Sequence, residues 1–404
     1  MQDNLNEVTG GVDTHSRVHV AAVVNTIGKI LATSSFPVTK AGYQALLAWM
    51  RSFGTLSAVG VEGTGAYGAG LSRFLTAANV TVIEVNRPNR QLRRRRGKSD
   101  TTDAESAARA VLNGEATTTP KSGVGNVEAI RALRVARRSA VKASTQASNQ
   151  IRDLIVTAPD ELRDRLVELS TTARIKLCAR MRPGAVTEPG EATKRSLRCL
   201  ARRHEALSNE IAELDAAIYE LCATENPALL GARGVGPEVA AALLVAAGDN
   251  PDRMRNEASF AALCGSSPVQ ASSGKTTRHR LNQGGNRDAN CALWRIVMVR
   301  LTCDPETAAY RDRRRTEGKS DREIMRCLKR YVAREIHRLL TTPPAVINGT
   351  ELRVARTTAN ISLNTAATAI NTRPTTLSNL ERGLQYDTEL ATRYQTWLST
   401  QRAA

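Results

Sequence analysis

The N-terminal part of the chain alternates short apolar runs with amphipathic stretches, and this pattern predicts a mixed sheet covered by helices. Three strands are expected between residues 9 and 38, with a turn at Asn25-Thr26-Ile27-Gly28 between the second and third. The elements expected next are a helix over 40–53, a strand over 58–62, a helix over 67–78 and a strand over 80–85. An arginine-rich loop then leads to a helix from about Thr101 to Leu112.

Residues 125–225 have a helical character and few strand-like runs. A long helix is expected from about Val127 to Val156. Farther along, apolar residues recur at alternating steps of four and three, which is typical of the seam of a coiled coil or a helical hairpin. These residues are Leu207, Ile211, Leu214, Ile218 and Leu221. The region is therefore interpreted as an arm, which acts as a spacer, as a dimerising element that carries nucleic acid, or as both.

The remainder of the chain is also predicted to be helical. Helices are expected over 286–301, 305–316 and 320–341, followed by a proline-containing linker. Two short helices, Ser362–Ile370 and Pro374–Arg382, then show helix-turn-helix spacing. The second would present four polar residues to a DNA groove, namely Thr375, Thr376, Ser378 and Asn379. We predict four parts, over residues 8–124, 125–225, 226–345 and 346–404.

The charge balance indicates a nucleic-acid partner. Lys and Arg number 57 against 39 acidic residues, which gives a formal net charge of +18. Aromatic residues make up only 3%, so binding of single strands by stacking is not favoured. No stretch approaches the roughly 20 apolar residues of a membrane span, and the N-terminus does not resemble a signal peptide. A cytoplasmic location without membrane contact is expected. The scattered cysteines and histidines do not form a zinc-binding set.

Four acids are expected to meet at one edge of the sheet. Asp13 lies on the first strand, Glu62 ends the fourth, and Asp100 and Asp103 share a face at the start of a helix. Clustered carboxylates repel one another unless cations neutralise them, and hard divalent ions suit such a site. Two ions roughly 3.5–4 Å apart would clamp a phosphodiester. Alone, the helix pair would equally be an ordinary N-terminal acid and a solvated charge.

Basic residues surround both candidate chemical sites. One group precedes the acid pair and is expected to follow a nucleic-acid backbone; it comprises Arg93, Arg94, Arg95, Arg96 and Lys98. A second group, Lys275, Arg278 and Arg280, follows Ser273-Gly274. This setting fits a serine nucleophile among phosphate-binding cations, although an ordinary loop serine is the other interpretation. Spacing identifies no general base, and His279 is a candidate only.

The motifs resemble those of a known family. Gly11-Val12-Asp13, Val61–Tyr67 and Lys98–Ala104 look like the DEDD motifs of a RuvC-like, ribonuclease-H-type domain. Gly265-Ser266-Ser267-Pro268, Ser273-Gly274 and Gly284–Arg287 look like the C-terminal transposase domain of the same family. These are the insertion-sequence transposases that act as bridge-RNA-guided recombinases. The resemblance covers roughly residues 8–341. The implied fold is α/β plus α, with a RuvC-like domain, a coiled-coil arm, a helical transposase domain and a helix-turn-helix tail.

The resemblance implies a function as well as a fold. Asp13, Glu62, Asp100 and Asp103 would bind magnesium, with two ions expected, and Ser273 would be the nucleophile that attacks DNA; Ser272 is the substitute. The partners implied are donor and target DNA, a guide or bridge RNA, and further copies of the chain in a tetramer, a dimer of dimers. A bacterial cytoplasm and association with the nucleoid would follow.

Two features depart from the family pattern. Asn282-Gln283 replaces a pair that is commonly basic or hydroxylated, and residues after 345 form a tail that resembles Cro/repressor-type helix-turn-helix modules. Two other functions are compatible with the residues. One is a metal-dependent endonuclease of the Holliday-junction type, which would use the four acids and water. The other is a noncatalytic DNA-binding regulator in which the tail is the active part.

Overall fold

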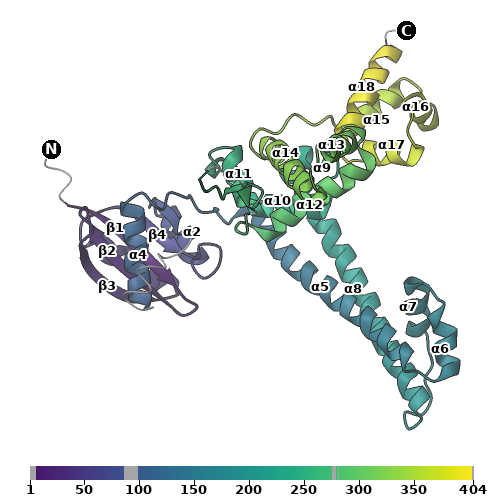
Figure 1. Ribbon diagram of the computed structural model, residues 1–404, viewed down its shortest axis with the longest axis horizontal. Helices are drawn as coiled ribbons and strands as arrows, with labels where there is room; N and C mark the ends of the chain where they lie inside the picture. Colours follow the sequence, from purple (N-terminus) through teal and green to yellow (C-terminus); the bar gives the residue numbers. More distant parts are fainter. Residues whose placement is uncertain (1–5, 86–98, 275–278, 281, 403–404) are drawn as a thin grey trace. The chain divides into compact units, whose positions relative to one another are not determined.

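The computed structural model describes residues 6–85, 99–274, 279–280 and 282–402 (Figure 1). The chain forms two compact units. The first contains residues 1–125 and 247–255, and the second contains residues 126–246 and 256–404. Residues 247–255 fall within the range 226–345 predicted for the third part, yet they pack with the first unit. Two side chains attach them there: Asp249 accepts hydrogen bonds from the backbone N–H groups of Gly123 and Val124, and Asn250 donates to the carbonyl of Pro120.

The first unit is built on a five-stranded mixed sheet, as the α/β pattern predicted. Its strands are β1 (Glu7–Thr14), β2 (Val18–Asn25), β3 (Ile30–Pro37), β4 (Thr55–Glu62) and β5 (Val82–Val85). The order across the sheet is β3-β2-β1-β4-β5. The first three strands form an antiparallel meander, whereas β4 runs parallel to β1 and β5 runs parallel to β4. The central strand β1 is thus bordered by one antiparallel and one parallel neighbour.

Helices cover both faces of this sheet. Strand alternation sends Val12 and Val61 to one face, where they pack with apolar residues of α1 (Lys40–Arg51) and α2 (Ala69–Ala77). Helix α4 (Asp100–Leu112) contacts β1, β2 and β4 on the opposite face (Figure 1). Its buried face consists largely of alanine, including Ala104, Ala107 and Ala108. These small side chains leave little distance between the helix and the strands.

The second unit begins with a helical arm. Helices α5 (Gly125–Val156) and α8 (Pro189–Glu225) run side by side, and α6 (Asp160–Val167) and α7 (Thr171–Ala179) pack at their far end (Figure 1). Arg137 of α5 forms an ion pair with Asp215 of α8. Of the predicted seam on α8, Ile218 is buried, and Leu207, Ile211, Leu214 and Leu221 are half-buried. Within the described residues, no helix combines the length and apolar character needed to cross a bilayer.

Six helices of 4 to 21 residues and a small hairpin follow the arm in the described part of the second unit. Its helices are α9 (Pro227–Leu230), α10 (Pro237–Ala247), α11 (Glu257–Leu263), α12 (Arg287–Cys303), α13 (Pro305–Thr316) and α14 (Asp321–Thr341). The short 3-10 helix η2 (Pro251–Arg253) precedes α11 and belongs to the first unit. Strands β6 (Val269–Gln270) and β7 (His279–Arg280) pair antiparallel. Helices α12 to α14 occupy nearly the ranges that the periodicity predicted.

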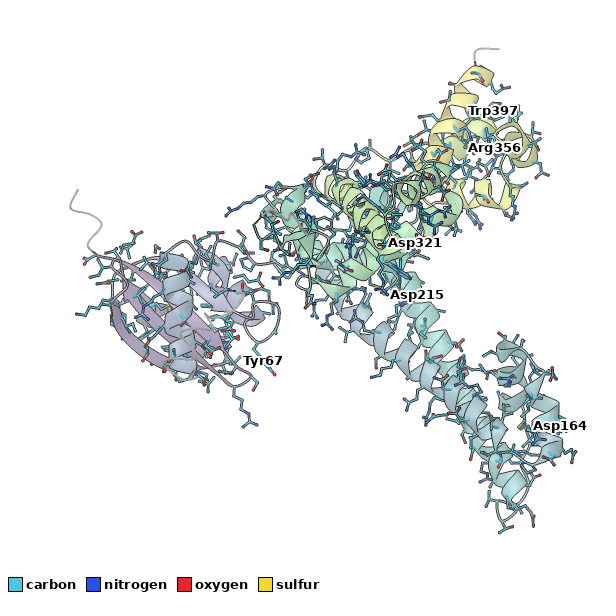
Figure 2. The ribbon with its side chains drawn as sticks, in the orientation of Figure 1. Tyr67, Asp164, Asp215, Asp321, Arg356 and Trp397 are labelled. Carbon is cyan, nitrogen blue, oxygen red and sulfur yellow. The ribbon has the colours of Figure 1, made fainter. Side chains whose placement is uncertain are left out.

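The tail is a four-helix module around its own core. Its helices are α15 (Gly349–Thr358), α16 (Leu363–Ala369), α17 (Pro374–Glu381) and α18 (Thr388–Arg402). The periodicity predicted the middle pair, and α15 and α18 complete the core around Leu377 and Tyr394. Arg356 and Trp397 mark this module in Figure 2. The buried Glu381 carboxylate accepts two hydrogen bonds from Arg356, at 2.7 and 2.9 Å, and one from the Tyr394 hydroxyl.

Candidate functional site

Two glycines allow α4 to lie close to the centre of the sheet. Gly11 of β1 is the register partner of Gly60 of β4. A Cβ atom added to Gly11 would lie 2.2 Å from the backbone nitrogen of Ala108, and one added to Gly60 would lie 2.8 Å from the carbonyl oxygen of Ala107. Any other residue would displace the helix. The glycine pair therefore determines how near the first turn of α4 comes to the strand ends.

The acids are two residues farther along the same strands. Because side chains alternate between faces, Asp13 projects on the face of Gly11, and Glu62 projects on the face of Gly60. Ser99 caps α4 by accepting a hydrogen bond from the backbone N–H of Thr102, so Asp100 and Asp103 fall in the first helical turn. The strand ends and the helix start thus bring the four predicted acids to one edge of the sheet.

The closest contacts in this cluster involve a histidine. Nε2 of His15 lies 3.1 Å from Oδ2 of Asp13 and 3.3 Å from Oδ2 of Asp100. One ligand atom from each of these residues lies within 4.8 Å of the other two. Two carboxylate oxygens and an imidazole nitrogen at this spacing form a donor set suited to a divalent cation. Asp13, His15 and Asp100 are therefore the candidate metal-binding residues.

The pKa of Asp13 reports the electrostatics of the cluster. Asp13 is only 7% exposed. Burial raises the pKa of its carboxyl group above the ordinary value of 3.8, and the nearby charges of Asp103 and Asp100 raise it further, while His15 opposes the shift. Asp103 is also buried, whereas Asp100 is exposed. The site therefore destabilises its own negative charge, and a bound cation would relieve this.

Glu62 occupies the boundary between the strand and a turn. It is the last residue of β4 and is half-buried, and its backbone carbonyl accepts a 2.8 Å hydrogen bond from the Thr14 hydroxyl. Gly63 follows with a φ of 68°, a conformation that favours glycine. The sequence interpretation did not include His15. His15 follows directly after the end of β1 at Thr14, and its signal is its spacing of two residues from Asp13.

Ser273 lies in the second unit, in the loop of the β6–β7 hairpin. Val269 pairs with Arg280 and Gln270 pairs with His279, so the loop begins directly after Gln270. Ser273 is exposed, and Gly274 beside it has a φ of 55°. His279 and Arg280 are both exposed on β7. Ser273 thus lies on the exposed, glycine-containing segment that follows β6 and is described as far as Gly274.

The other predicted contact residues are placed as follows. Arg93, Arg94, Arg95, Arg96, Lys98, Lys275 and Arg278 lie outside the described residues. In the tail, Thr375 is exposed, and Thr376, Ser378 and Asn379 are half-buried. The Asn379 side chain accepts a 2.8 Å hydrogen bond from Arg382. Thr375 therefore presents the most accessible hydroxyl of the four predicted groove residues.

Comparison with protein families places the chain among the transposases. Residues 10–158 match the DEDD domain of IS110-type transposases. Residues 226–312 match a second domain, described as the transposase IS116/IS110/IS902 family. These ranges include the acid cluster and the serine hairpin, and together they span more than half of the chain. The chain belongs to this IS110-type family of transposases.

A relative from Streptomyces coelicolor is similar over a shorter region. This protein, the insertion element IS110 uncharacterized 43.6 kDa protein, is 32% identical over 106 residues. The match covers 26% of this chain and 26% of that protein, so it spans about a quarter of either length.

Proposed function

We propose that the chain is a DNA transposase that moves an insertion element by phosphoryl transfer, with Ser273 as the nucleophile. The observation that carries the proposal is the convergence of Asp13, His15 and Asp100 at the start of α4. Burial, and after it the charges of Asp103 and Asp100, raise the pKa of Asp13, which supports a site that receives cations. The family match over both domains supports DNA as the substrate.

The cofactor in this proposal is Mg²⁺, and two ions are expected. Asp13 and Asp100 would supply carboxylate oxygens, His15 would supply a nitrogen, and Glu62 and Asp103 would complete the acidic set. When bound, divalent ions polarise the scissile phosphate and offset the charge that develops during its substitution. The buried carboxylates of Asp13 and Asp103 fix the position of the site, while the exposed Asp100 leaves it open on one side.

Ser273 would attack the phosphorus of one DNA strand. A bond forms from its Oγ to phosphorus, one sugar hydroxyl leaves, and the chain becomes covalently attached to the strand. Attack by a sugar hydroxyl of the partner strand then releases the serine. Because one phosphoester replaces another at each step, strand exchange needs no external energy source. His279, the first residue of β7 and the register partner of Gln270, is the candidate proton acceptor.

Other parts of the chain have proposed binding roles. The arm formed by α5 and α8 would join copies of the chain into a dimer of dimers, and a bridge RNA from the element would pair with donor and target DNA. The tail would add affinity for DNA. Its turn supports this: Asn371 has a φ of 50°, and the backbone N–H of Thr372 bonds to the carbonyl of Ala367, which ends α16 sharply before α17.

A covalent-adduct assay tests the nucleophile. The chain is incubated with Mg²⁺, labelled DNA carrying both ends of the encoding element, and RNA transcribed from that element. A denaturing gel should show a labelled protein–DNA adduct for the wild type and for Ser272→Ala, and none for Ser273→Ala. Asp13→Ala should also lose the adduct while still binding DNA.

The same assay separates the alternative functions. Cleavage that persists in Ser273→Ala without any adduct would contradict the serine mechanism and favour a metal-dependent endonuclease that uses water. Activity that persists after all four acids are changed would contradict both enzymatic mechanisms and favour a DNA-binding regulator.

A further inference from the structure

Helix α14 carries a stripe of arginines that its own structure does not explain. Arg326, Arg330 and Arg334 follow one another at intervals of four residues, so they share a face of the helix. Like charges at this spacing destabilise a helix. Glu257 of α11 compensates two of them: its carboxylate accepts hydrogen bonds from Arg330 at 3.1 Å and from Arg334 at 2.6 Å. In the described part of the chain, Arg326 forms no salt bridge.

This stripe faces a cavity of about 800 Å³ beside the serine hairpin. The cavity is also lined by Gly265–Pro268, which lead into β6, and by His279 and Arg280 of β7. Asp321, which is labelled in Figure 2, is the first residue of α14, the helix that carries these arginines. The cavity thus lies between a helix with excess positive charge and the hairpin whose loop contains Ser273.

The lining of the cavity is strongly basic. Six of its described lining residues are basic: Arg280, Lys319, Arg326, Lys329, Arg330 and Arg334. The acid among the described lining residues is Glu323, and its carboxylate already accepts hydrogen bonds from the backbone N–H and the hydroxyl of Ser320, at 3.0 and 2.8 Å. Glu257 pairs with Arg330 and Arg334, and Glu323 lies near Lys319 and Arg326, so two acids oppose six basic residues and the cavity keeps an excess of positive charge.

Lys329 provides a second, independent indication of an anion site. The residue is only 7% exposed, and its ammonium group donates a 3.0 Å hydrogen bond to the side-chain oxygen of Asn290. Asn290 is itself held by a 2.7 Å hydrogen bond from its amide nitrogen to the carbonyl of Cys264. A buried ammonium group is costly when its partner is a neutral amide. In addition, the terminal nitrogen Nη1 of Arg330 is buried without a hydrogen-bond partner.

We propose that this cavity binds a backbone phosphate of the DNA strand on which the serine hairpin acts, through Arg326, Arg330 and Lys329. A phosphodiester supplies the anionic oxygens that the arginine fork and the ammonium group match. Its position against β6 and β7 would hold the strand next to the Ser273 loop. This assignment rests on the proposed function and adds to it a strand-holding site on α14.

Salt-dependent DNA binding tests the site without requiring chemistry. All variants are made with Ser273→Ala and assayed in EDTA by fluorescence anisotropy of a labelled duplex between 50 and 200 mM salt. Each phosphate contact contributes about 0.9 to the slope of log K against log salt. Because the three side chains share one phosphate, Arg326→Gln/Arg330→Gln should reduce the slope by about 1, and Arg326→Gln alone by part of that amount.

A matched variant controls for total charge. Arg322→Gln/Arg338→Gln removes the same charge from exposed positions of α14 that do not line the cavity, and its slope should equal that of the parent. The single variant Arg326→Gln is expected to fold normally, because Arg326 is exposed and the ion pairs of Glu257 with Arg330 and Arg334 are retained. Equal slopes for the cavity and control variants would overturn the site, even if the wild type forms the serine adduct. Absence of that adduct would instead count against the proposed function.

Discussion

Gly11 of β1 lies directly opposite Gly60 of β4 in the parallel register of the sheet, and both face α4. The acids Asp13 and Glu62 follow at the same spacing on their strands, so the glycines determine how closely the helix approaches the strand ends from which the acids project. The alanine-rich face of α4 is the complementary surface. Packing at a point without any reactive group thus controls the geometry of the candidate metal site.

Gly11→Ala should therefore damage the site indirectly. The added methyl group would lie 2.2 Å from a backbone nitrogen of α4, so the helix must move, at a cost of about 3 kcal/mol in the free energy of unfolding. Hydrogen exchange of the α4 amides should become faster, and metal affinity should fall. Gly65→Ala is the control, because a Cβ atom there has open space around it. Unchanged exchange in Gly11→Ala would contradict the packing argument.

Asp13→Asn should change how stability depends on pH. Burial raises the pKa of Asp13 in the folded chain above 3.8, so the stability associated with the protonated carboxyl is fully present below pH 3.8 and is lost as the pH rises through the raised pKa. The asparagine variant has no proton to lose. Without metal, it should be more stable than the wild type at neutral pH.

Metal should reverse this order. A divalent ion at 100 times its Kd adds about 2.7 kcal/mol to the stability of the protein that binds it. Thermal unfolding with and without Mg²⁺ should show this gain for the wild type and little gain for Asp13→Asn. An equal gain in both proteins would place the ion elsewhere.

His15→Ala should weaken metal binding directly. The imidazole nitrogen lies within 3.3 Å of both carboxylates, and even the loss of a residue that supports a metal ligand lowers affinity about 10- to 100-fold. Mn²⁺ serves as the probe, since electron paramagnetic resonance reports both its affinity and its nitrogen ligands. The nitrogen coupling should be present in the wild type and in His204→Ala, which changes a histidine of α8. It should be absent in His15→Ala, and its persistence there would exclude His15 as a ligand.

Thr375→Glu tests the DNA-binding role of the tail. Thr375 is exposed at the start of α17, where a new carboxylate would meet the negative charge of a DNA groove. Affinity for duplex DNA should fall roughly tenfold, equivalent to about 1.4 kcal/mol. Thr396→Glu makes the same change at an exposed position of α18 and should leave affinity unchanged. Equal affinities of the two variants for DNA would argue against a helix-turn-helix contact at α17.

The tail also contains a buried ion pair that its sequence pattern does not reveal. Its two central helices were predictable from capping residues and apolar spacing. The buried contact between Arg356 and Glu381 was not, because the two charges are 25 residues apart and lie on different helices. Such a pair forms only when α15 packs against α17, since burial of either charge alone would be strongly unfavourable.

The order of residues along the chain was enough to predict the helices and strands and the kinds of side chain at their ends. Local periodicity identifies the strands, α4, the long helices of the arm and the tail pair, since backbone hydrogen bonding and apolar spacing act over a few residues. The acids Asp13, Glu62, Asp100 and Asp103 were found in the same way, because each lies near the end or start of a predicted element. His15 was accessible to the same reasoning through its spacing from Asp13.

Which of these side chains come into contact depends on how the strands and helices pack against one another. The register of β1 against β4 places Gly11 opposite Gly60, and the resulting approach of α4 brings Asp100 to His15. The basic cavity joins α14 to the β6–β7 hairpin, which lies some 40 residues earlier in the chain. Contacts of this kind depend on packing between segments that are far apart in the sequence. A local pattern of residues does not indicate how close two such segments lie in space.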